Sequence, residues 1–220
     1  MVKKNLKKSG ELRYFSKANN IKIPKLHKTI LSRLLFPVLA LISREQTLKL
    51  GLTPIDDERV IMGLKHTKGR LLDIGCGANN FVRSHGNGIG VDVAPWDGCD
   101  LVVEDTAKLP FDDKSFDTVS FLACLNHIPN RNDAVKEAAR VLKNDGHIIV
   151  TMITPKLGAF IHWLRFKNDP DNQERHINHK DELLGMSHEH TKSILRDAGF
   201  TKIKQKRFVF GLNNIYIASR

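Results

Sequence analysis

From residue 69 onward, short apolar runs alternate with segments of helical spacing. Residues 132–143 illustrate the helical type, because Val135, Ala138, Ala139 and Leu142 recur every three or four positions. The apolar runs that predict buried strands are 70–74, 88–92, 101–103, 116–122 and 147–152. Strands that alternate with helices predict a doubly wound α/β domain on a mostly parallel sheet.

The C-terminal part of the chain predicts one more helix and two more strands. Ser187 is expected to cap a helix that runs to Ala198, and Gly199 is expected to end it. Residues 201–210 and 214–218 follow as two strands joined by a short turn. We therefore expect the chain to close with a β-hairpin.

The first fifty residues differ from the rest in charge. Their nine Lys and three Arg stand against two Glu, which gives +10 of the chain's net charge of +11. The apolar stretch 29–43 is too short to span a bilayer, which takes about 20 apolar residues. Three predictions stay open: the stretch lies on an anionic membrane surface, it packs on the chain's own domain, or the segment binds nucleic acid. We treat 1–50 as an appendage and 51–220 as the main domain.

Cysteine usage bears on the compartment. Cys76, Cys99 and Cys124 form no C-x-x-C pair and no even-numbered framework. This favours a reducing, cytoplasmic environment, with a peripheral position on the inner face of a membrane if the N-terminal stretch binds lipid. Residues 1–8 are polar with no apolar run directly after them, so no signal peptide is expected.

A glycine turn, Gly75-Cys76-Gly77, follows the first predicted strand. Backbone without Cβ can approach a ligand closely, and the next helix presents free N–H groups. Alone, the turn also fits a truncated dinucleotide fingerprint. Asp92 and Asp105 follow the next two strands, and the carboxyl ends of parallel strands face one crevice. Asp92 is placed to accept hydrogen bonds from ribose hydroxyls, and Asp105 from an adenine amine.

Five motifs in this order resemble those of the class I S-adenosylmethionine-dependent methyltransferases, in particular the small-molecule group that includes the ubiquinone and menaquinone biosynthesis enzymes. The resemblance covers roughly residues 55–220. The motifs are Leu71-Leu72-Asp73-Ile74-Gly75-Cys76-Gly77, Gly90-Val91-Asp92, Glu104-Asp105-Thr106-Ala107-Lys108-Leu109-Pro110-Phe111, Ser115-Phe116-Asp117 and Leu125-Asn126-His127-Ile128-Pro129.

The resemblance implies a seven-stranded Rossmann-like sheet with an antiparallel C-terminal strand, and S-adenosylmethionine as cofactor. It assigns the methionine end to Asp73 and the glycine turn, the ribose to Asp92, the adenine to Asp105 with Thr106, and the sulfonium side to the pair after the fourth strand. The cofactor-binding positions are Asp73, Gly75, Cys76, Gly77, Asp92, Val93, Asp105, Thr106, Ala123 and Cys124.

Two regions are candidates for acceptor chemistry. His127 follows the fourth strand, and a histidine that titrates near neutral pH suits a general base for a hydroxyl acceptor. The connection 154–186 is expected to act as a lid on the acceptor side. Within it, 157–166 is apolar on too many sides for an isolated surface helix, and His176 is a candidate to contact the acceptor. No metal site is predicted, because no Cys or ordered carboxylate set joins the histidines.

The leading function hypothesis is methyl transfer to oxygen of a small-molecule or lipid- or glycan-linked acceptor, at a membrane surface if the basic N-terminus binds there. A nucleic-acid methyltransferase is the alternative that the positive charge suggests. Against it, Leu125-Asn126-His127-Ile128-Pro129 is not the Asn/Asp-Pro-Pro-aromatic motif, and no Pro-Cys pair offers a cytosine nucleophile. A non-catalytic cofactor-binding module is the third hypothesis. The oligomeric state is left open.

Overall fold

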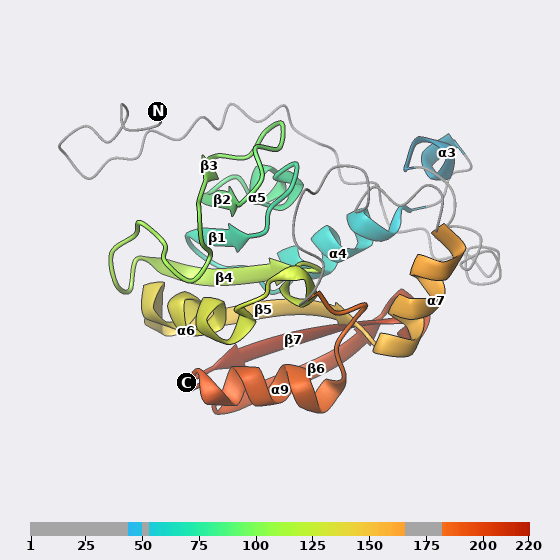
Figure 1. The fold of residues 1–220 in the computed structure, drawn as a ribbon. Coiled ribbons are helices and arrows are strands. Elements are labelled where there is room, and N and C mark those ends of the chain that lie inside the picture. Colours follow the sequence, from blue (N-terminus) through green and yellow to red (C-terminus); the bar gives the residue numbers. More distant parts are fainter. Residues whose placement is uncertain (1–43, 50–52, 166–181) are drawn as a thin grey trace.

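The computed structural model describes residues 44–49, 53–165 and 182–220. Its centre is one seven-stranded sheet of order β3-β2-β1-β4-β5-β7-β6 (Figure 1). The apolar stretch 29–43 and His176 lie outside the described residues, so what the sequence predicts for them stays a prediction.

The strand pairings agree with the sequence-based fold. β1 pairs in parallel with β2 and β4, β2 with β3, and β4 with β5. β7 runs antiparallel to both β5 and β6. The strands are β1 (Leu71–Ile74), β2 (Gly88–Asp92), β3 (Leu101–Val102), β4 (Phe116–Leu122), β5 (Leu142–Ile153), β6 (Lys202–Phe208) and β7 (Asn213–Ser219). The predicted mostly parallel sheet with an antiparallel C-terminal strand is confirmed.

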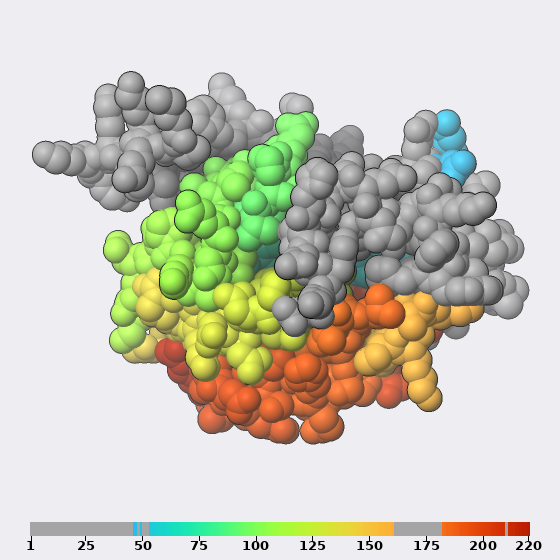
Figure 2. All heavy atoms as spheres, in the orientation of Figure 1, coloured from blue at the N-terminus to red at the C-terminus, as the bar shows by residue number. Residues whose placement is uncertain are grey.

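Helices cover both faces of the sheet (Figure 1). The described α-helices are α3 (Arg44–Lys49), α4 (Ile55–Leu64), α5 (Asn80–His85), α6 (Arg131–Val141), α7 (Pro155–Arg165) and α9 (His188–Asp197), and the short 3-10 helices are η1 (Leu125–His127) and η3 (Val209–Gly211). α4 packs beside α5, and α6 packs beside α9. Figure 2 shows the face that α6 (yellow) and α9 (orange) cover.

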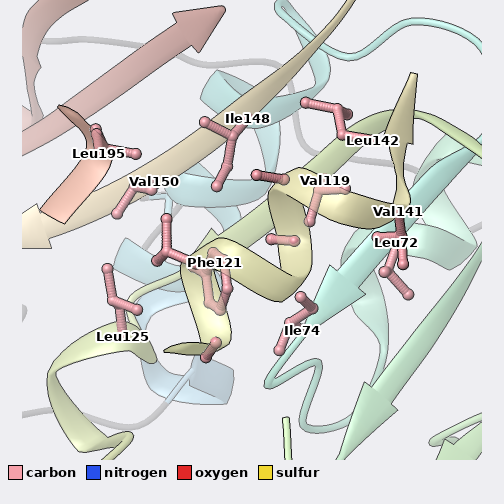
Figure 3. Close-up of a cluster of buried hydrophobic side chains, with 14 of the residues drawn as sticks. Leu72, Ile74, Val119, Phe121, Leu125, Val141, Leu142, Ile148, Val150 and Leu195 are labelled. Carbon is pink, nitrogen blue, oxygen red and sulfur yellow. The ribbon is translucent and has the colours of Figure 1, made fainter. Parts of the chain in front are cut away.

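Alternate residues of β1 point to opposite faces, as the period of a strand requires. Leu72 and Ile74 join the larger core cluster, which includes side chains of α6 and α9. Leu71 packs instead with Phe81 and Val82 of α5. Figure 3 shows the larger cluster, to which β1, β4, β5 and α9 all contribute. Burial on both faces explains why the strands read as continuous apolar runs.

Two helix boundaries differ from the sequence-based prediction. The helix expected directly after the glycine turn begins only at residue 80, because Asn79 adopts a left-handed φ of 59°. The helix predicted over 132–143 ends earlier. Leu142 already belongs to β5, where it pairs with Phe116 before the register shifts.

The predicted cap of α9 is present. The hydroxyl of Ser187 accepts a hydrogen bond from the His190 N–H at 3.2 Å, and Gly199 follows the helix with a φ of 90°. Replacing Ser187 with Ala is expected to lower the free energy of unfolding by about 1 kcal/mol, because a helix N–H loses its acceptor. Urea denaturation measures the change. Ser187→Asp, which can still accept that bond, is the matched control, and an equal loss in both variants would contradict the capping role.

Candidate functional site

The glycine turn lies at the carboxyl ends of β1 and β2. The N–H groups of Gly75 and Cys76 donate to the Val91 carbonyl at 2.8 and 3.1 Å. Gly75 has a φ of 72°, and a Cβ built on it would lie 2.6 Å from the Cβ of Cys124. Gly77 has a φ of 49°, and a Cβ built there would meet no atom within 4 Å. The first glycine is therefore required by backbone angle and packing, whereas the second borders open space.

Asp92, at the end of β2, is bound to this turn. Its Oδ2 accepts from the Gly77 N–H at 2.9 Å, and its Oδ1 accepts from the Ala94 N–H at 3.1 Å. The side chain is buried. A carboxylate has about four acceptor positions, so two stay available for a ligand. The structure thus brings together two predicted site residues that are fifteen positions apart.

Asp73 is the most deeply buried acid of the predicted site, at 2% exposure. The Ser120 hydroxyl donates to its Oδ1 at 2.6 Å. Burial, helped by the nearby Asp92 charge and opposed by the Ser120 hydrogen bond, raises the pKa of Asp73 to about 7.

A pH dependence follows from this shift. Asp73 titrates near 3.8 when unfolded and near 7 when folded, so the folded state holds more protons between these values. Its contribution to stability is complete below the unfolded pKa and is lost as the pH rises toward 7. We expect the unfolding free energy of the native chain to fall between pH 4 and 7 relative to Asp73→Asn, and to level off above. Parallel profiles in chemical denaturation would contradict the raised pKa.

Asp105 follows β3 and is held in place by two donors. Its Oδ1 accepts from the Ala107 N–H at 2.8 Å and from the Asn130 side-chain amide at 2.9 Å. The Asn130 hydrogen bond is the main cause that lowers the pKa of Asp105, so the carboxylate is charged at neutral pH. Neighbouring Thr106 is buried, and Val93, beside Asp92, is 41% exposed. No sequence pattern points to Asn130, because its contact with Asp105 is long-range.

The turn after β4 approaches the glycine turn from the other side. Ala123 has a left-handed φ of 57°, which is uncommon for a residue other than glycine. The Cys124 thiol donates to the Ile74 carbonyl at 2.9 Å. Both residues therefore lie at the end of β1, next to Gly75. Strained backbone of the kind seen at Ala123 is often found in functional sites.

His127 ends η1, one turn beyond Cys124, whose carbonyl accepts its N–H at 2.9 Å. The His127 Nδ1 lies 3.6 Å from Oε2 of Glu182, and the two side chains are only 14% and 16% exposed. Two hydrogen bonds between Asn126 and Leu183 fix the Glu182 segment against η1: Leu183 N–H to the Asn126 carbonyl, and the Asn126 amide to the Leu183 carbonyl. No sequence pattern points to Glu182, because it lies far along the chain from His127.

His188, in the C-terminal part of the chain, has a structural role. His188 begins α9, and its Nδ1 lies 2.7 Å from the Tyr216 hydroxyl and 3.0 Å from the Gln205 amide. Over the described parts of the chain, no group of three His, Cys, Asp or Glu could hold a metal ion.

The arrangement fits a nucleoside that carries a charged amino-acid tail. Asp92 and Asp105 present acceptor oxygens at successive strand ends, and open space lies over Gly77. Asp73 lies near Asp92, close enough for its charge to raise the pKa of Asp73. Carboxylates suit hydroxyl, amine and ammonium donors, so each part of S-adenosylmethionine that the sequence assigned has a matching group.

Known proteins are similar to this chain in sequence and in fold. Residues 72–150 match a family model described as a methyltransferase domain. The chain is 32% identical over 148 residues to the sterol 4-C-methyltransferase strm-1 of Caenorhabditis elegans, covering 58% of this chain and 42% of that protein. It is 29% identical over 119 residues to the ubiquinone/menaquinone biosynthesis C-methyltransferase UbiE of Chromobacterium violaceum, covering 49% of each.

Two further matches broaden the comparison. The probable tRNA methyltransferase 9B of Bos taurus is 32% identical over 92 residues, which is 36% of this chain and 20% of that protein. A solved S-adenosylmethionine-dependent methyltransferase structure from Thermotoga maritima superposes with a TM-score of 0.56 at 22% identity, covering 74% of this chain and 87% of that one.

The three protein relatives are matched over less than half of their own length. What the matches have in common is the domain that holds the glycine turn, and the solved structure shares the sheet that positions it. The ordered motifs, the fold and the family model agree. Residues 72–150 therefore form a methyltransferase domain, and the fold around it is the one seen in S-adenosylmethionine-dependent methyltransferases.

Proposed function

We propose that the chain transfers a methyl group from S-adenosylmethionine to a small apolar acceptor, with His127 as the general base. The observation that carries this proposal is the approach of His127 to Glu182, one turn beyond Cys124. When bound, the cofactor supplies an electrophilic methyl group on a sulfonium. The acceptor must then lose a proton, and a base at this edge of the sheet can take it.

The two side chains have separate roles in this proposal. At 3.6 Å the Glu182 carboxylate attracts a protonated imidazole without a hydrogen bond of normal length. Catalytic hydrogen bonds often tighten only when substrate is bound. A carboxylate on the Nδ1 side favours the proton there, which leaves Nε2 as the atom that accepts the acceptor's proton. Glu182 would thus act as a positioning residue, and His127 as the catalytic one.

The cofactor would be held by the three acids and the glycine turn. Asp92 would accept from the ribose hydroxyls, Asp105 from the adenine amine, and Asp73 from the methionine ammonium. Most of the rate enhancement in an in-line displacement comes from holding methyl and acceptor in line and excluding water. The predicted lid, 154–186, would exclude water in this way. The described parts of it, α7 and the segment after Glu182, lie at the carboxyl ends of the parallel strands (Figure 1).

Apolar side chains support an apolar acceptor. Phe160 on α7 is 49% exposed and Leu184 is 48% exposed. A Cβ built on Gly158 would overlap the Leu184 carbonyl, so α7 packs directly on the Leu184 segment. Exposed large apolar side chains on adjoining elements suit a hydrophobic ligand.

The relatives' names bear on the methylated atom. The sequence favours oxygen as the methylated atom, whereas two relatives are named C-methyltransferases. A phenol or an enol satisfies both, because loss of its hydroxyl proton leaves an anion that is nucleophilic at the oxygen and at the carbon two bonds away from it. We therefore propose an acceptor of this class, and the same base serves either atom.

Membrane attachment through the N-terminal segment 1–50 remains part of the proposal. In the described stretches of the chain, no helix is long and apolar enough to cross a bilayer. A basic segment followed by apolar residues fits a lipid surface that carries negative charge. Sedimentation with anionic liposomes, lost on deletion of residues 1–45 and absent with neutral liposomes, would support it. Equal sedimentation of the shortened chain would contradict it.

A nucleic-acid acceptor is the second candidate, because one specific observation favours it. The Lys206 ammonium lies 3.5 Å from Nε2 of His66, and burial together with this lysine lowers the pKa of His66. Exposed Lys65 and Lys68 lie nearby in sequence. Such a basic surface suits phosphates. The relative named as a tRNA methyltransferase is consistent with this candidate.

One experiment separates the candidates. The purified chain is incubated with S-adenosylmethionine labelled in the methyl group, together with a lipid extract or with total RNA. We expect label in the organic-soluble fraction and release of S-adenosylhomocysteine. Label in RNA alone would favour the second candidate. Cofactor binding without turnover on either substrate would favour a non-catalytic module.

A further inference from the structure

Two of the three cysteines meet beside the glycine turn. The Cys76 thiol donates to the sulfur of Cys99, with the two Sγ atoms 3.6 Å apart. Both residues are half-buried and both are free thiols. Cys76 lies in the turn itself, whereas Cys99 lies in the loop between β2 and β3.

The residues on either side of Cys99 are tied to the turn, so this approach is built into the fold. The Asn79 side-chain amide donates to the Gly98 carbonyl at 3.1 Å and to Oδ2 of Asp100 at 2.7 Å. Asp100 also accepts from the Gly90 N–H at 2.8 Å. The Cys99 loop is thereby held against the residues that follow Cys76.

We propose that Cys76 and Cys99 are a reversible oxidation site, which closes to a disulfide and prevents the glycine turn from binding the cofactor. A disulfide places its sulfurs about 2.05 Å apart. Forming the bond therefore brings the Cys76 and Cys99 sulfurs closer by more than 1 Å and pulls the glycine turn and the β2–β3 loop together. Cys76 lies between Gly75, whose N–H binds Val91, and Gly77, whose N–H binds Asp92. Moving it distorts the contacts on which the cofactor site depends.

The chemistry is that of a peroxide and two thiols. The Cys99 thiolate attacks one oxygen of hydrogen peroxide, the O–O bond breaks, and a sulfenic acid and water result once the leaving hydroxide takes a proton. The Cys76 sulfur then attacks the Cys99 sulfur, the S–O bond breaks, and a second water leaves with the Cys76 proton. Two thiols lose two electrons and two protons, and the peroxide is reduced to two waters.

The order of these steps follows from the hydrogen bond between the thiols. That bond lowers the pKa of Cys99, in opposition to its burial, and raises the pKa of Cys76. Cys99 therefore ionises first and is the attacking group, and Cys76 is the resolving thiol.

The test compares full-length protein before and after treatment with hydrogen peroxide. Peptide mapping without reductant should give a Cys76–Cys99 disulfide, and calorimetry should give S-adenosylmethionine binding at least tenfold weaker, restored by dithiothreitol. Cys99→Ser should bind the cofactor as the untreated chain does and should keep that affinity after peroxide. Cys124→Ser should form the same cross-link as the native chain. Should Cys99→Ser fail to fold, Cys99→Ala replaces it.

The expected loss of cofactor binding on disulfide formation rests on the proposed function. The oxidation site and the proposed function can nevertheless fail separately. If reduced protein does not bind S-adenosylmethionine, the proposed function fails, while the mapped disulfide still reports on the thiol pair. If reduced protein binds and the mapped disulfide leaves the affinity unchanged, or if peroxide gives no Cys76–Cys99 cross-link, the inference is overturned.

Discussion

Replacing His127 with Ala is expected to lower kcat about 10²- to 10⁴-fold, the usual contribution of a general base. The reason is that no other group among the described residues combines its place after β4 with a carboxylate at 3.6 Å. Cofactor affinity should stay nearly unchanged, because the cofactor acids lie on other elements. Methyl transfer under single-turnover conditions and calorimetry with S-adenosylmethionine measure the two effects separately.

Two controls show whether the loss is chemical. Added imidazole should restore part of the activity of His127→Ala, because it can replace the missing base in the space left behind. Glu182→Gln should lower kcat less, and the double variant should fall no further than His127→Ala alone, since a positioning residue has nothing left to position. Additive losses and no rescue would contradict the base assignment.

Replacing Asp92 with Ala should weaken S-adenosylmethionine binding by about 1–3 kcal/mol, which is roughly 5- to 150-fold in Kd. Charged hydrogen bonds to the ribose are lost, and the Gly77 and Ala94 N–H groups lose their acceptor. The unfolding free energy should fall as well, because those N–H groups stay next to a buried position.

Asp97 is the matched control for this variant. It is an exposed acid in the same β2–β3 loop, so Asp97→Asn changes charge by the same amount without touching the turn. Calorimetry should give native affinity for that variant. A similar loss in both would mean that net charge, not the Asp92 hydrogen bonds, determines cofactor binding.

The fold was predictable because its strands are buried on both faces. The segments 88–92 and 116–122 match β2 and β4 in both bounds, since a continuous apolar run leaves little freedom in where a buried strand begins. Predicted helix boundaries were wrong where a single contact or backbone angle outweighed the local hydrophobic pattern. The left-handed backbone of Asn79 makes α5 begin later than expected. Pairing with Phe116 places Leu142 in β5 and not in the preceding helix.

The candidate site was predictable in part. Asp92 could be placed because every parallel strand delivers its carboxyl end to the same edge, and the contact of Asp92 with Gly77 agrees with that rule. Glu182 could not be predicted as a site residue. It lies 55 positions beyond His127, and its approach depends on how the later segment packs against η1. The contacts of Asn130 with Asp105 and of Cys99 with Cys76 could not be predicted for the same reason, since each pair meets only through the tertiary fold.

The most direct measurement is calorimetric titration of the folded, reduced protein with S-adenosylmethionine and, separately, with a nicotinamide dinucleotide. We expect micromolar binding of S-adenosylmethionine and none of the dinucleotide, because the acids at β2 and β3 and the glycine turn match the nucleoside and the charged tail of the former. Binding of the dinucleotide alone, or of neither ligand, would contradict the assignment of this edge of the sheet to methyl transfer.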